Sequence, residues 1–440
     1  MLIPCKLQSN DVLKIMHSSS KPKIILSLPL LVLSLIYIWK DVILLPSHSQ
    51  SRRYSQLSNE LSHKYDSFTK RTLLEGSKLS SYSFNDHILN EAKLARQEQL
   101  GKPIQRENAT LLMLVRNWEL PDALMSMRSL EDRFNRHYHY DWIFMNDVPF
   151  TTEFIEATSS MASGNAYHVL IPKEDWDCPE HIDSNFLKER IDIMSDTGVL
   201  YGKSKSYRNM CHFNSGYFFR QEILSDYDYY FRVEPGVEYF CDFPYDPFQV
   251  MNLKDKKYGF VISLREYEET ILTLWESVEE YIDIDDGETI DMATNAYDFI
   301  TGDDLVGNDK AIYVTSNDYN MCHFWTNFEI GDLNFFRSDA YIEFFNHLDA
   351  KGGFYYERWG DAPIHSIAAS LLLNKDEIIH FDEIGYYHAP YFTCPTSYNM
   401  ILNQRCLCDP TSPQNIPLES LSCLRRWWKY GSGKTFMNEI

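Results

Sequence analysis

Short runs of apolar and aromatic residues recur through the middle of the chain, and each has the length of a β-strand. In the first run, Thr110–Val115, apolar side chains occupy successive positions, which is typical of a strand buried on both faces. Runs of this kind predict strands at Thr110–Val115, Tyr140–Met145, Tyr167–Ile171, Tyr229–Val233 and Tyr258–Leu264.

Helical spacing separates several of these runs. Pro121 suits the first turn of a helix that places Leu124, Met127 and Leu130 on one face. Because strands alternate with helices of this length, the pattern predicts parallel βαβ units in a doubly wound α/β sheet. Three later helices are also expected. One follows from an apolar stripe at Ile271, Leu274, Trp275, Val278 and Ile282, and a second begins at the cap Ser338 and carries Tyr341, Phe344, Phe345 and Leu348. For the third, Asp361-Ala-Pro363 reads as the cap and first turn of a helix that runs through Leu373.

The N-terminal region has a different pattern. Residues 1–23 are polar and basic, whereas Ile24 to Trp39 contains no charge and a second apolar patch ends at Leu45. We interpret residues 24–45 as a transmembrane signal anchor with a cytoplasmic tail before it. A cleaved signal peptide and a buried core helix are the alternatives. Residues 46–103, rich in Ser, Gln, Lys and Glu, are expected to form a stem that buries little.

Composition and charge narrow the class of protein. A content of 44% hydrophobic and 15% aromatic residues indicates a large folded core. The net charge is −22, and the first 45 residues hold five Lys and two Asp, so the acidic excess lies beyond the anchor. Nucleic acid is therefore excluded as an expected partner. The sequence has no G-x-G-x-x-G or Walker loop, so a dinucleotide or ATP cradle of those kinds is not predicted. The acids of Asp283–Asp291 are expected in a solvated loop.

Cysteine use favours an oxidising compartment for the region beyond the anchor. Eight cysteines lie there, an even number that allows up to four disulfides, and Cys5 lies before the anchor. The sequence contains no C-x-x-C pair, so a zinc site is not predicted. Asn108-Ala-Thr110 is an N-glycosylation sequon beside the first predicted strand, and its occupancy stays open.

The strand Tyr229–Val233 stops at Glu234-Pro235-Gly236, because Pro lacks a ladder donor and Gly permits a sharp bend. In open α/β sheets, ligands and metals bind at the carboxyl ends of strands, where Glu234 is expected. Glu238 and Asp242 follow, and the three carboxylates could reach one cation. Solvated acids at a strand end are the alternative.

Five blocks of sequence, taken together, are specific enough to indicate a protein family. In order, they resemble the motifs of the fungal Golgi α-1,2-mannosyltransferases, glycosyltransferase family 15, over roughly Asn108 to Cys408. The resemblance implies a GT-A-like single catalytic domain at residues 104–440 with a mostly parallel sheet. It also implies GDP-mannose as donor, Mn²⁺ as cofactor and retention of configuration. The blocks are Ser206–Gly216, Glu234–Val237 with Cys241-Asp242, Cys322–Ile330, Arg358–Pro363 and Tyr386–Pro390.

The same resemblance assigns a metal pair. Glu234 matches the metal-binding Glu of the family, and His388, on a late loop, matches its second metal ligand. A packed or loop histidine is the alternative for His388. This chain has Glu-Pro-Gly where some members have Glu-Pro-Asp, so any metal contact from the third position is absent.

Further site residues follow from the resemblance. Glu329, in an aromatic setting, is the candidate nucleophile; in a front-face route it would instead stabilise positive charge, and a buried hydrogen-bond anchor is the remaining alternative. Tyr207 matches a donor-site tyrosine, and Arg208 is expected to clamp the diphosphate, unless both simply pack. Asp361 is expected to bind or orient the acceptor, or only to cap its helix. Surface aromatics, with Trp359, Tyr386 and Tyr387 as examples, could stack on sugars.

These expectations together indicate a Golgi type II membrane enzyme that transfers mannose from GDP-mannose to O-linked or N-linked glycans of glycoproteins. An inactive relative that binds glycans or scaffolds other transferases is one alternative. A retaining glycoside hydrolase that needs no metal is another.

Overall fold

A computed structural model describes residues 106–302, 319–395 and 397–433. The predicted cytoplasmic tail, anchor and stem, and Cys5, lie outside the described residues. Within the described part of the chain, no helix is long and apolar enough to cross a membrane. All the described residues belong to one compact unit, residues 81–440.

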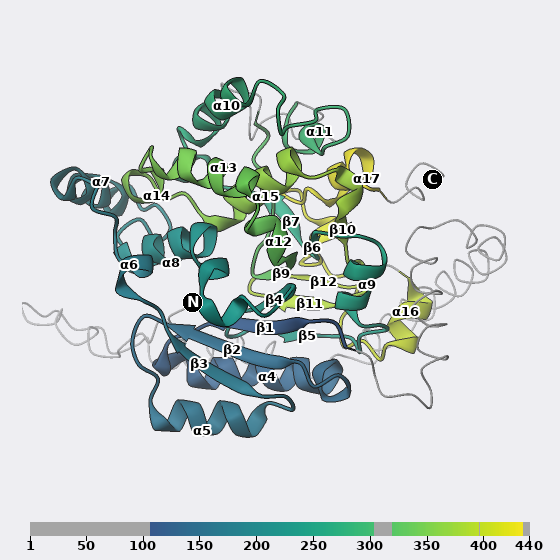
Figure 1. The fold of residues 1–440 in the computed structure, drawn as a ribbon. Coiled ribbons are helices and arrows are strands. Elements are labelled where there is room, and N and C mark those ends of the chain that lie inside the picture. The colour runs from purple at the N-terminus through teal and green to yellow at the C-terminus, as the bar shows by residue number, and fades with distance from the viewer. Residues whose placement is uncertain (1–105, 303–318, 396, 434–440) are drawn as a thin grey trace, which may run out of the picture. The chain divides into compact units, whose positions relative to one another are not determined.

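A seven-stranded sheet organises this unit, with strand order β10-β6-β9-β4-β1-β2-β3 (Figure 1). Neighbours pair in parallel, except that β9 runs antiparallel to both β4 and β6. The predicted α/β architecture with a mostly parallel sheet is confirmed. The strands are β1 Ala109–Leu114, β2 Asp141–Asn146, β3 Ala166–Leu170, β4 Tyr229–Val233, β6 Tyr258–Phe260, β9 Phe328–Asp332 and β10 Ile378–His380.

Helices cover the sheet from two sides. Figure 1 shows α4 and α5 beneath β1–β3, and α8, α13 and α15 on the opposite side. These main helices are α4 Leu120–Arg133, α5 Thr152–Met161, α8 Lys205–Gly216, α13 Asp339–Asp349 and α15 Asp361–Leu372. The others are α6 Lys173–Trp176, α7 Ser184–Asp196, α9 Pro247–Leu253, α10 Leu274–Asp285, α11 Tyr297–Ile300, α12 Leu333–Phe336, α14 Gly353–Tyr356, α16 Tyr398–Asn403 and α17 Leu424–Tyr430.

Two small sheets complete the framework. One has the order β12-β11-β5, and the other pairs β7 with β8. The first places a late hairpin beside the segment that follows Glu234, because β11 pairs with both β12 and β5. Their bounds are β5 Glu238–Tyr239, β7 Ser263–Arg265, β8 Cys322–Phe324, β11 Tyr386–His388 and β12 Tyr391–Thr393.

Local signals in the sequence account for several helix ends and buried faces. Pro121 lies in the first turn of α4, where its missing N–H has no helical partner to lose. The Ser338 hydroxyl accepts a hydrogen bond from the Tyr341 amide and caps α13, as predicted. The apolar faces of both helices lie in the core, with Met127 and Leu130 buried in α4, and with Tyr341, Phe344, Phe345 and Leu348 buried in α13.

Three expectations about elements were wrong in detail. The run Tyr258–Leu264 forms two strands, because the chain leaves the main sheet after Phe260 and pairs again as β7 with β8. Helix α10 begins at Leu274, after a 3₁₀ turn, and continues to Asp285, so part of the acidic segment is helical. The cap of α15 is Gly360, which leaves the Asp361 side chain free for other partners.

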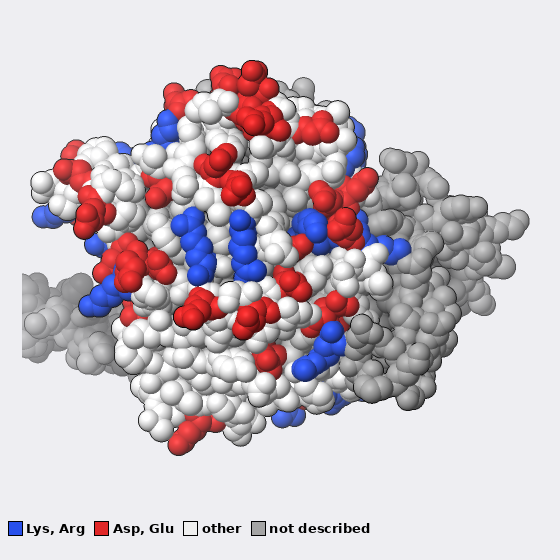
Figure 2. Space-filling model, in the orientation of Figure 1, with Lys and Arg blue, Asp and Glu red and all other residues white. Residues whose placement is uncertain are grey.

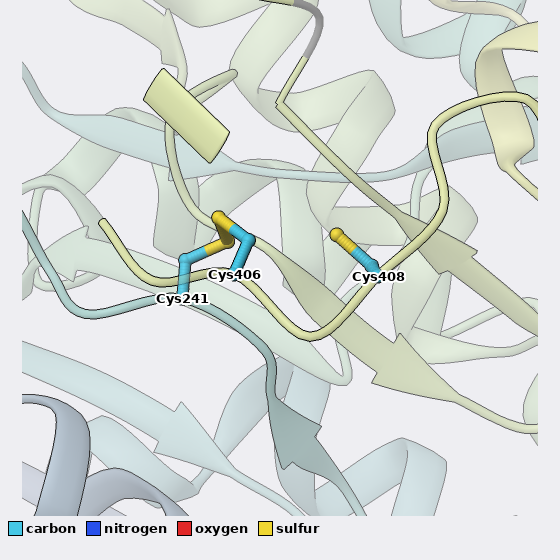
Figure 3. Close-up of side chains that lie close together, drawn as sticks. All are labelled: Cys241, Cys406 and Cys408. Atoms are coloured by element: carbon cyan, nitrogen blue, oxygen red, sulfur yellow. A yellow bond between two sulfur atoms is a disulfide. The ribbon is translucent and has the colours of Figure 1, made fainter. Parts of the chain in front are cut away.

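Disulfides join distant parts of the chain. The three bonds are Cys241–Cys406, Cys322–Cys423 and Cys394–Cys408, while Cys178 and Cys211 are free thiols. Figure 3 shows the Cys241–Cys406 bond with the sulfur of Cys408 nearby. Because all three of these sulfurs are in disulfides, they offer no thiolate to a metal ion.

The surface is acidic on the face drawn in Figure 2. Acidic side chains gather there over α10 at the top of the view. This helix alone contributes Glu276, Glu279, Glu280, Asp283 and Asp285, in keeping with the net charge of −22.

Candidate active site

Arg232, near the end of β4, is the centre of the candidate site. Its Nη2 lies 2.5 Å from Oε1 of Glu234, and its Nη1 lies 2.5 Å from Oδ2 of Asp361. Residues two apart on a strand share one face, so Arg232 and Glu234 point the same way from β4. Across the antiparallel pairing with β9, Arg232 lies opposite Glu329. One buried guanidinium therefore adjoins all three predicted site carboxylates.

The charge of Arg232 keeps its two carboxylate partners ionised. Burial by itself raises the pKa of Glu234, but the guanidinium of Arg232 outweighs burial and lowers that pKa from 4.5 to about 2. For Asp361 burial also opposes ionisation, and Arg232 again lowers the pKa below its ordinary value. Thr326 adds a hydrogen bond to Asp361, 2.7 Å long. The site thus holds two fixed negative charges.

Glu234 and His388, the predicted metal pair, lie together. Nε2 of His388 is 3.6 Å from Oε2 of Glu234. Nδ1 of His388 lies 3.0 Å from the carbonyl oxygen of Ala389, and a carbonyl only accepts, so Nδ1 carries the proton. In the neutral imidazole Nε2 then presents a lone pair to an ionised carboxylate. Two facing acceptors at this distance suit a shared cation.

This donor set fits a divalent ion such as Mn²⁺. A carboxylate oxygen and an imidazole nitrogen are ligands that such ions accept. The hydrogen bond from Nδ1 to a backbone carbonyl is the usual way to orient a metal-binding histidine. With two protein ligands, the rest of the coordination shell would come from substrate oxygens and water.

Glu329 lies deepest in the site. Its Oε1 accepts a hydrogen bond from the Tyr230 hydroxyl, and its Oε2 lies 2.5 Å from the Tyr258 hydroxyl and 2.8 Å from Nδ1 of His365. Nε2 of His365 donates to the Asn214 carbonyl oxygen at 3.0 Å. With a proton on Nε2, both Nδ1 of His365 and Oε2 of Glu329 would be acceptors. Their contact therefore requires a further proton, shared between His365 and Glu329. The carboxylate is held from three sides.

The exposure of the side chains gives the depth of each group. The exposed fractions are 28% for Glu234 and 25% for His388, and they fall to 11% for Arg232, 7% for Asp361 and 1% for Glu329. The metal pair is thus the accessible part of the site, and Glu329 lies at its floor.

The two predicted donor-binding residues on α8, Tyr207 and Arg208, lie in different surroundings. Tyr207 stacks on Tyr201, with ring centroids 4.4 Å apart, and the guanidinium of Arg358 lies 5.3 Å from its ring. Arg208 is fully buried, and its nitrogens contact four backbone carbonyls and the Met194 sulfur. As placed here, Arg208 ties chain segments together and does not face the metal pair.

Three other expectations about the site were wrong. Among the described residues, Glu234, Glu238 and Asp242 do not form a group that could hold one cation. Asp242 pairs instead with Arg133 and Arg405. Trp359 and Tyr386, expected as surface aromatics, are completely buried; Tyr387 is partly exposed.

A cavity of about 340 Å³ lies along the same edge of the sheet. Asp147 follows β2 and Ile171 follows β3, and the parallel strands β3, β2, β1 and β4 all end on this edge. The Oδ1 atom of Asn209 is buried and has no hydrogen-bond partner among the described residues. The cavity is lined by Asp147, Ile171, Lys173, Trp176, Asp177, Lys205, Ser206 and Asn209.

Sequence reasoning missed Arg232, His365 and the two tyrosines that hold Glu329. A signal for Arg232 was present, because a charged residue within a buried strand needs a charged partner. The partners of Glu329 gave no such signal, since they come from β4, β6 and α15 and meet only in the folded chain.

Solved structures with this fold define the class of protein. The Mn/GDP form of core-mannan synthase A from Aspergillus fumigatus is 39% identical, with a TM-score of 0.69 over 74% of this chain and 86% of that one. The mannosyltransferase Ktr4p of Saccharomyces cerevisiae, in complex with GDP, is 35% identical, with a TM-score of 0.70 over 79% and 92%. The fold is that of GT-A-like glycosyltransferases.

The chain belongs to the family described as glycolipid 2-alpha-mannosyltransferase, whose model matches residues 56–432. The probable mannosyltransferase KTR2 of Saccharomyces cerevisiae is 61% identical over 86% of this chain and 88% of its own length. The alpha-1,2 mannosyltransferase KTR1 of the same yeast is 44% identical over 73% and 78%. The predicted family is confirmed.

Proposed function

We propose that this protein is a Mn²⁺-dependent, retaining α-1,2-mannosyltransferase that uses GDP-mannose and extends O-linked or N-linked glycans of glycoproteins. The observation that carries the proposal is the pair of Glu234 and His388, two facing acceptor atoms 3.6 Å apart at the accessible end of the site. The family and the Mn/GDP form of its solved relative support the donor and the metal.

The order of the strand ends suggests how the GDP-mannose donor would lie along the edge of the sheet. Glu234 follows β4, Arg116 follows β1 and donates to Ser206 at 2.5 Å, and the cavity lies past β2 and β3. With strands about 4.8 Å apart, β2 and β3 lie roughly 10 and 14 Å from β4. An extended nucleoside diphosphate can bridge this distance. We place the diphosphate at the metal pair and the nucleoside toward the cavity.

Cleavage of the bond between the anomeric carbon and the diphosphate oxygen leaves negative charge on GDP and positive charge on the mannose. When bound, Mn²⁺ would neutralise part of the charge on the diphosphate. With the diphosphate at the metal pair, Arg232, which pairs with Glu234, would lie beside it. The negative charge of Asp361, together with the partial negative charge on the hydrogen-bonded Glu329 oxygens, would stabilise the cationic sugar by electrostatics.

Glu329 has too little freedom in this arrangement for the nucleophile assignment to be preferred. Its oxygens accept from Tyr230, Tyr258 and His365, and covalent attack would first require one oxygen to be released. We therefore favour the front-face route, in which the acceptor oxygen bonds to the anomeric carbon on the side that GDP leaves. The acceptor proton passes to the departing phosphate, and Asp361 orients the acceptor hydroxyl.

We further propose that residues 24–45 anchor the protein in the Golgi membrane as a type II protein, with residues 46–103 as a luminal stem. The apolar run and the basic residues before it support this orientation. The disulfides Cys241–Cys406, Cys322–Cys423 and Cys394–Cys408 suit the oxidising lumen.

The function is tested by following mannose transfer from GDP-mannose to α-methylmannoside with Mn²⁺, and then with a chelator. Transfer that needs Mn²⁺ and is lost in Glu234→Ala is expected. Transfer that persists in the chelator would contradict the metal role. GDP binding without transfer would favour the inactive glycan-binding relative.

A further inference from the structure

Helix α15 presents two residues to the two central strands of the site. Asp361 and His365 are four residues apart, so they lie on one face of the helix. Asp361 pairs with Arg232 on β4, and His365 contacts Glu329 on β9. Because Arg232 and Glu329 are register partners, the helix is fixed across both strands at once. The proposed mechanism gives Asp361 a role and leaves His365 without one.

His365 uses both of its ring nitrogens. Nδ1 lies 2.8 Å from Oε2 of Glu329, and Nε2 lies 3.0 Å from the carbonyl oxygen of Asn214 on α8. The side chain is 1% exposed, and its ring packs against Phe336 with centroids 5.0 Å apart. The histidine therefore has two separable polar contacts, one with a site carboxylate and one with the backbone of a neighbouring helix.

Gly331 makes room for the other donors to Glu329. It is the register partner of Tyr230 on β4 and of Tyr258 on β6. A Cβ at this position would lie 2.6 Å from the Tyr230 ring, so a larger residue would displace that ring. Because position 331 has no side chain, both tyrosine hydroxyls can reach the carboxylate of Glu329, two residues earlier on β9.

These donors are divided unequally between the two oxygens of Glu329. Among the described residues, Oε2 accepts from Tyr258 and shares a proton with His365, whereas Oε1 accepts from Tyr230. A carboxylate oxygen has two lone pairs, so Oε2 is fully engaged and Oε1 keeps one lone pair. His365 and Tyr258 thus fix the direction in which the carboxylate is turned.

We propose that His365 is a positioning residue for mannosyl transfer, which holds Oε2 of Glu329 and so keeps Oε1 available to the reacting sugar. No bond to His365 forms or breaks in the reaction. The proposal rests on the proposed function and adds to it a residue that acts through Glu329. A histidine that only ties α15 to α8 through the Asn214 carbonyl is the alternative.

Two amide substitutions in the full chain separate the contacts of His365. In His365→Gln the amide nitrogen lies near the position of Nε2, so the bond to the Asn214 carbonyl is kept and the donor to Glu329 is lost. In His365→Asn the amide nitrogen lies near the position of Nδ1, so the donor to Glu329 is kept and the bond to Asn214 is lost.

The assay follows transfer from GDP-mannose to α-methylmannoside. We expect kcat to fall about 10 to 100-fold in His365→Gln and at most about fivefold in His365→Asn, because only the first releases the carboxylate. The KM for GDP-mannose and the affinity for Mn²⁺ should stay within about twofold in both variants, since a positioning residue for the chemical step leaves binding unchanged.

A Glu329→Gln background tests whether His365 acts through Glu329. The loss caused by His365→Gln should shrink there to about twofold, because the carboxylate that it orients is already gone. Tyr258→Phe removes the other donor to Oε2 and should also lower kcat at unchanged KM, whether or not the histidine variants fold. His347→Gln is the matched control with wild-type kcat, since Nε2 of His347 also lies 2.9 Å from a backbone carbonyl, that of Ser277.

A loss in His365→Asn that equals or exceeds the loss in His365→Gln would overturn the proposal in favour of the bond to Asn214. A loss from His365→Gln that persists in full in the Glu329→Gln background, or a Tyr258→Phe variant with normal kcat, would also overturn it. Failure of the proposed function would instead appear as no mannose transfer by the wild type, and the positioning role would fall with it.

Discussion

Replacing Arg232 by Met should destabilise the protein strongly at neutral pH, because it leaves the carboxylates of Glu234 and Asp361 without their cation. The shift in the pKa of Glu234 from 4.5 to about 2 corresponds to ~3 kcal/mol. Since 28% of the Glu234 side chain is exposed, solvent screening reduces this contribution to ~2 kcal/mol. With the more deeply buried Asp361 added, we expect a total loss of about 3 to 5 kcal/mol in the free energy of unfolding.

The loss should depend on pH in a defined direction. Glu234 and Asp361 have folded-state pKa values below their unfolded values, so their contribution to stability is complete above the unfolded values. For Glu234 it disappears as the pH falls from 4.5 toward 2. The difference between wild type and Arg232→Met should therefore be largest near neutral pH and shrink as the pH falls through this window.

Urea unfolding at several pH values, followed by tryptophan fluorescence, measures this difference. Arg133→Met is the matched control, because Arg133 pairs with Asp242 in a more exposed position where Arg405 also contributes. The control should cost no more than about 1 kcal/mol. If Arg232→Met also costs less than that, or if its cost does not vary with pH, the central role of Arg232 is refuted.

Three further results are expected. Glu329→Gln should lower kcat about 10² to 10³-fold and leave the affinity for Mn²⁺ unchanged, measured by steady-state transfer and metal titration; a near-normal kcat would remove Glu329 from catalysis. A Cys322→Ser/Cys423→Ser double variant opens a crosslink that spans a sequence separation of 101, and should cost about 2 to 4 kcal/mol in urea unfolding; no loss would contradict a stabilising role. Ser338→Ala should cost ~1 kcal/mol through loss of the α13 cap, and Ser338→Asp should restore most of it.

The sequence predicts the elements of the fold better than their connections. β1, β2 and β4 appear close to their predicted positions, because a run of buried apolar residues bounded by turn residues determines each one. β3 also lies where its apolar run predicts it, although this edge strand is partly exposed. The split of Tyr258–Leu264 was not predicted, since both halves are equally apolar and only their different partners, β9 and β8, separate them. Disulfide pairing likewise depends on positions that spacing does not reveal.

The candidate site, like the fold, could be predicted from the sequence only in part. Glu234 could be placed from the strand before it, and the resemblance supplied His388. Arg232 was not recognised, because its role depends on Asp361, which lies far away in the chain and next to Gly360 at the start of α15. The enclosure of Glu329 depends on the register of β4 against β9, which no local pattern fixes.

Direct measurement of Mn²⁺ binding tests the central claim, that Glu234 and His388 form the metal site. Electron paramagnetic resonance with Mn²⁺ in the presence of GDP follows bound and free metal without requiring catalysis. We expect tight binding by wild type and a loss of at least about 10 to 100-fold in Glu234→Gln and in His388→Ala. Glu238→Gln, a nearby acid on β5, should bind as wild type does. Unchanged Mn²⁺ affinity in both site variants would contradict the account.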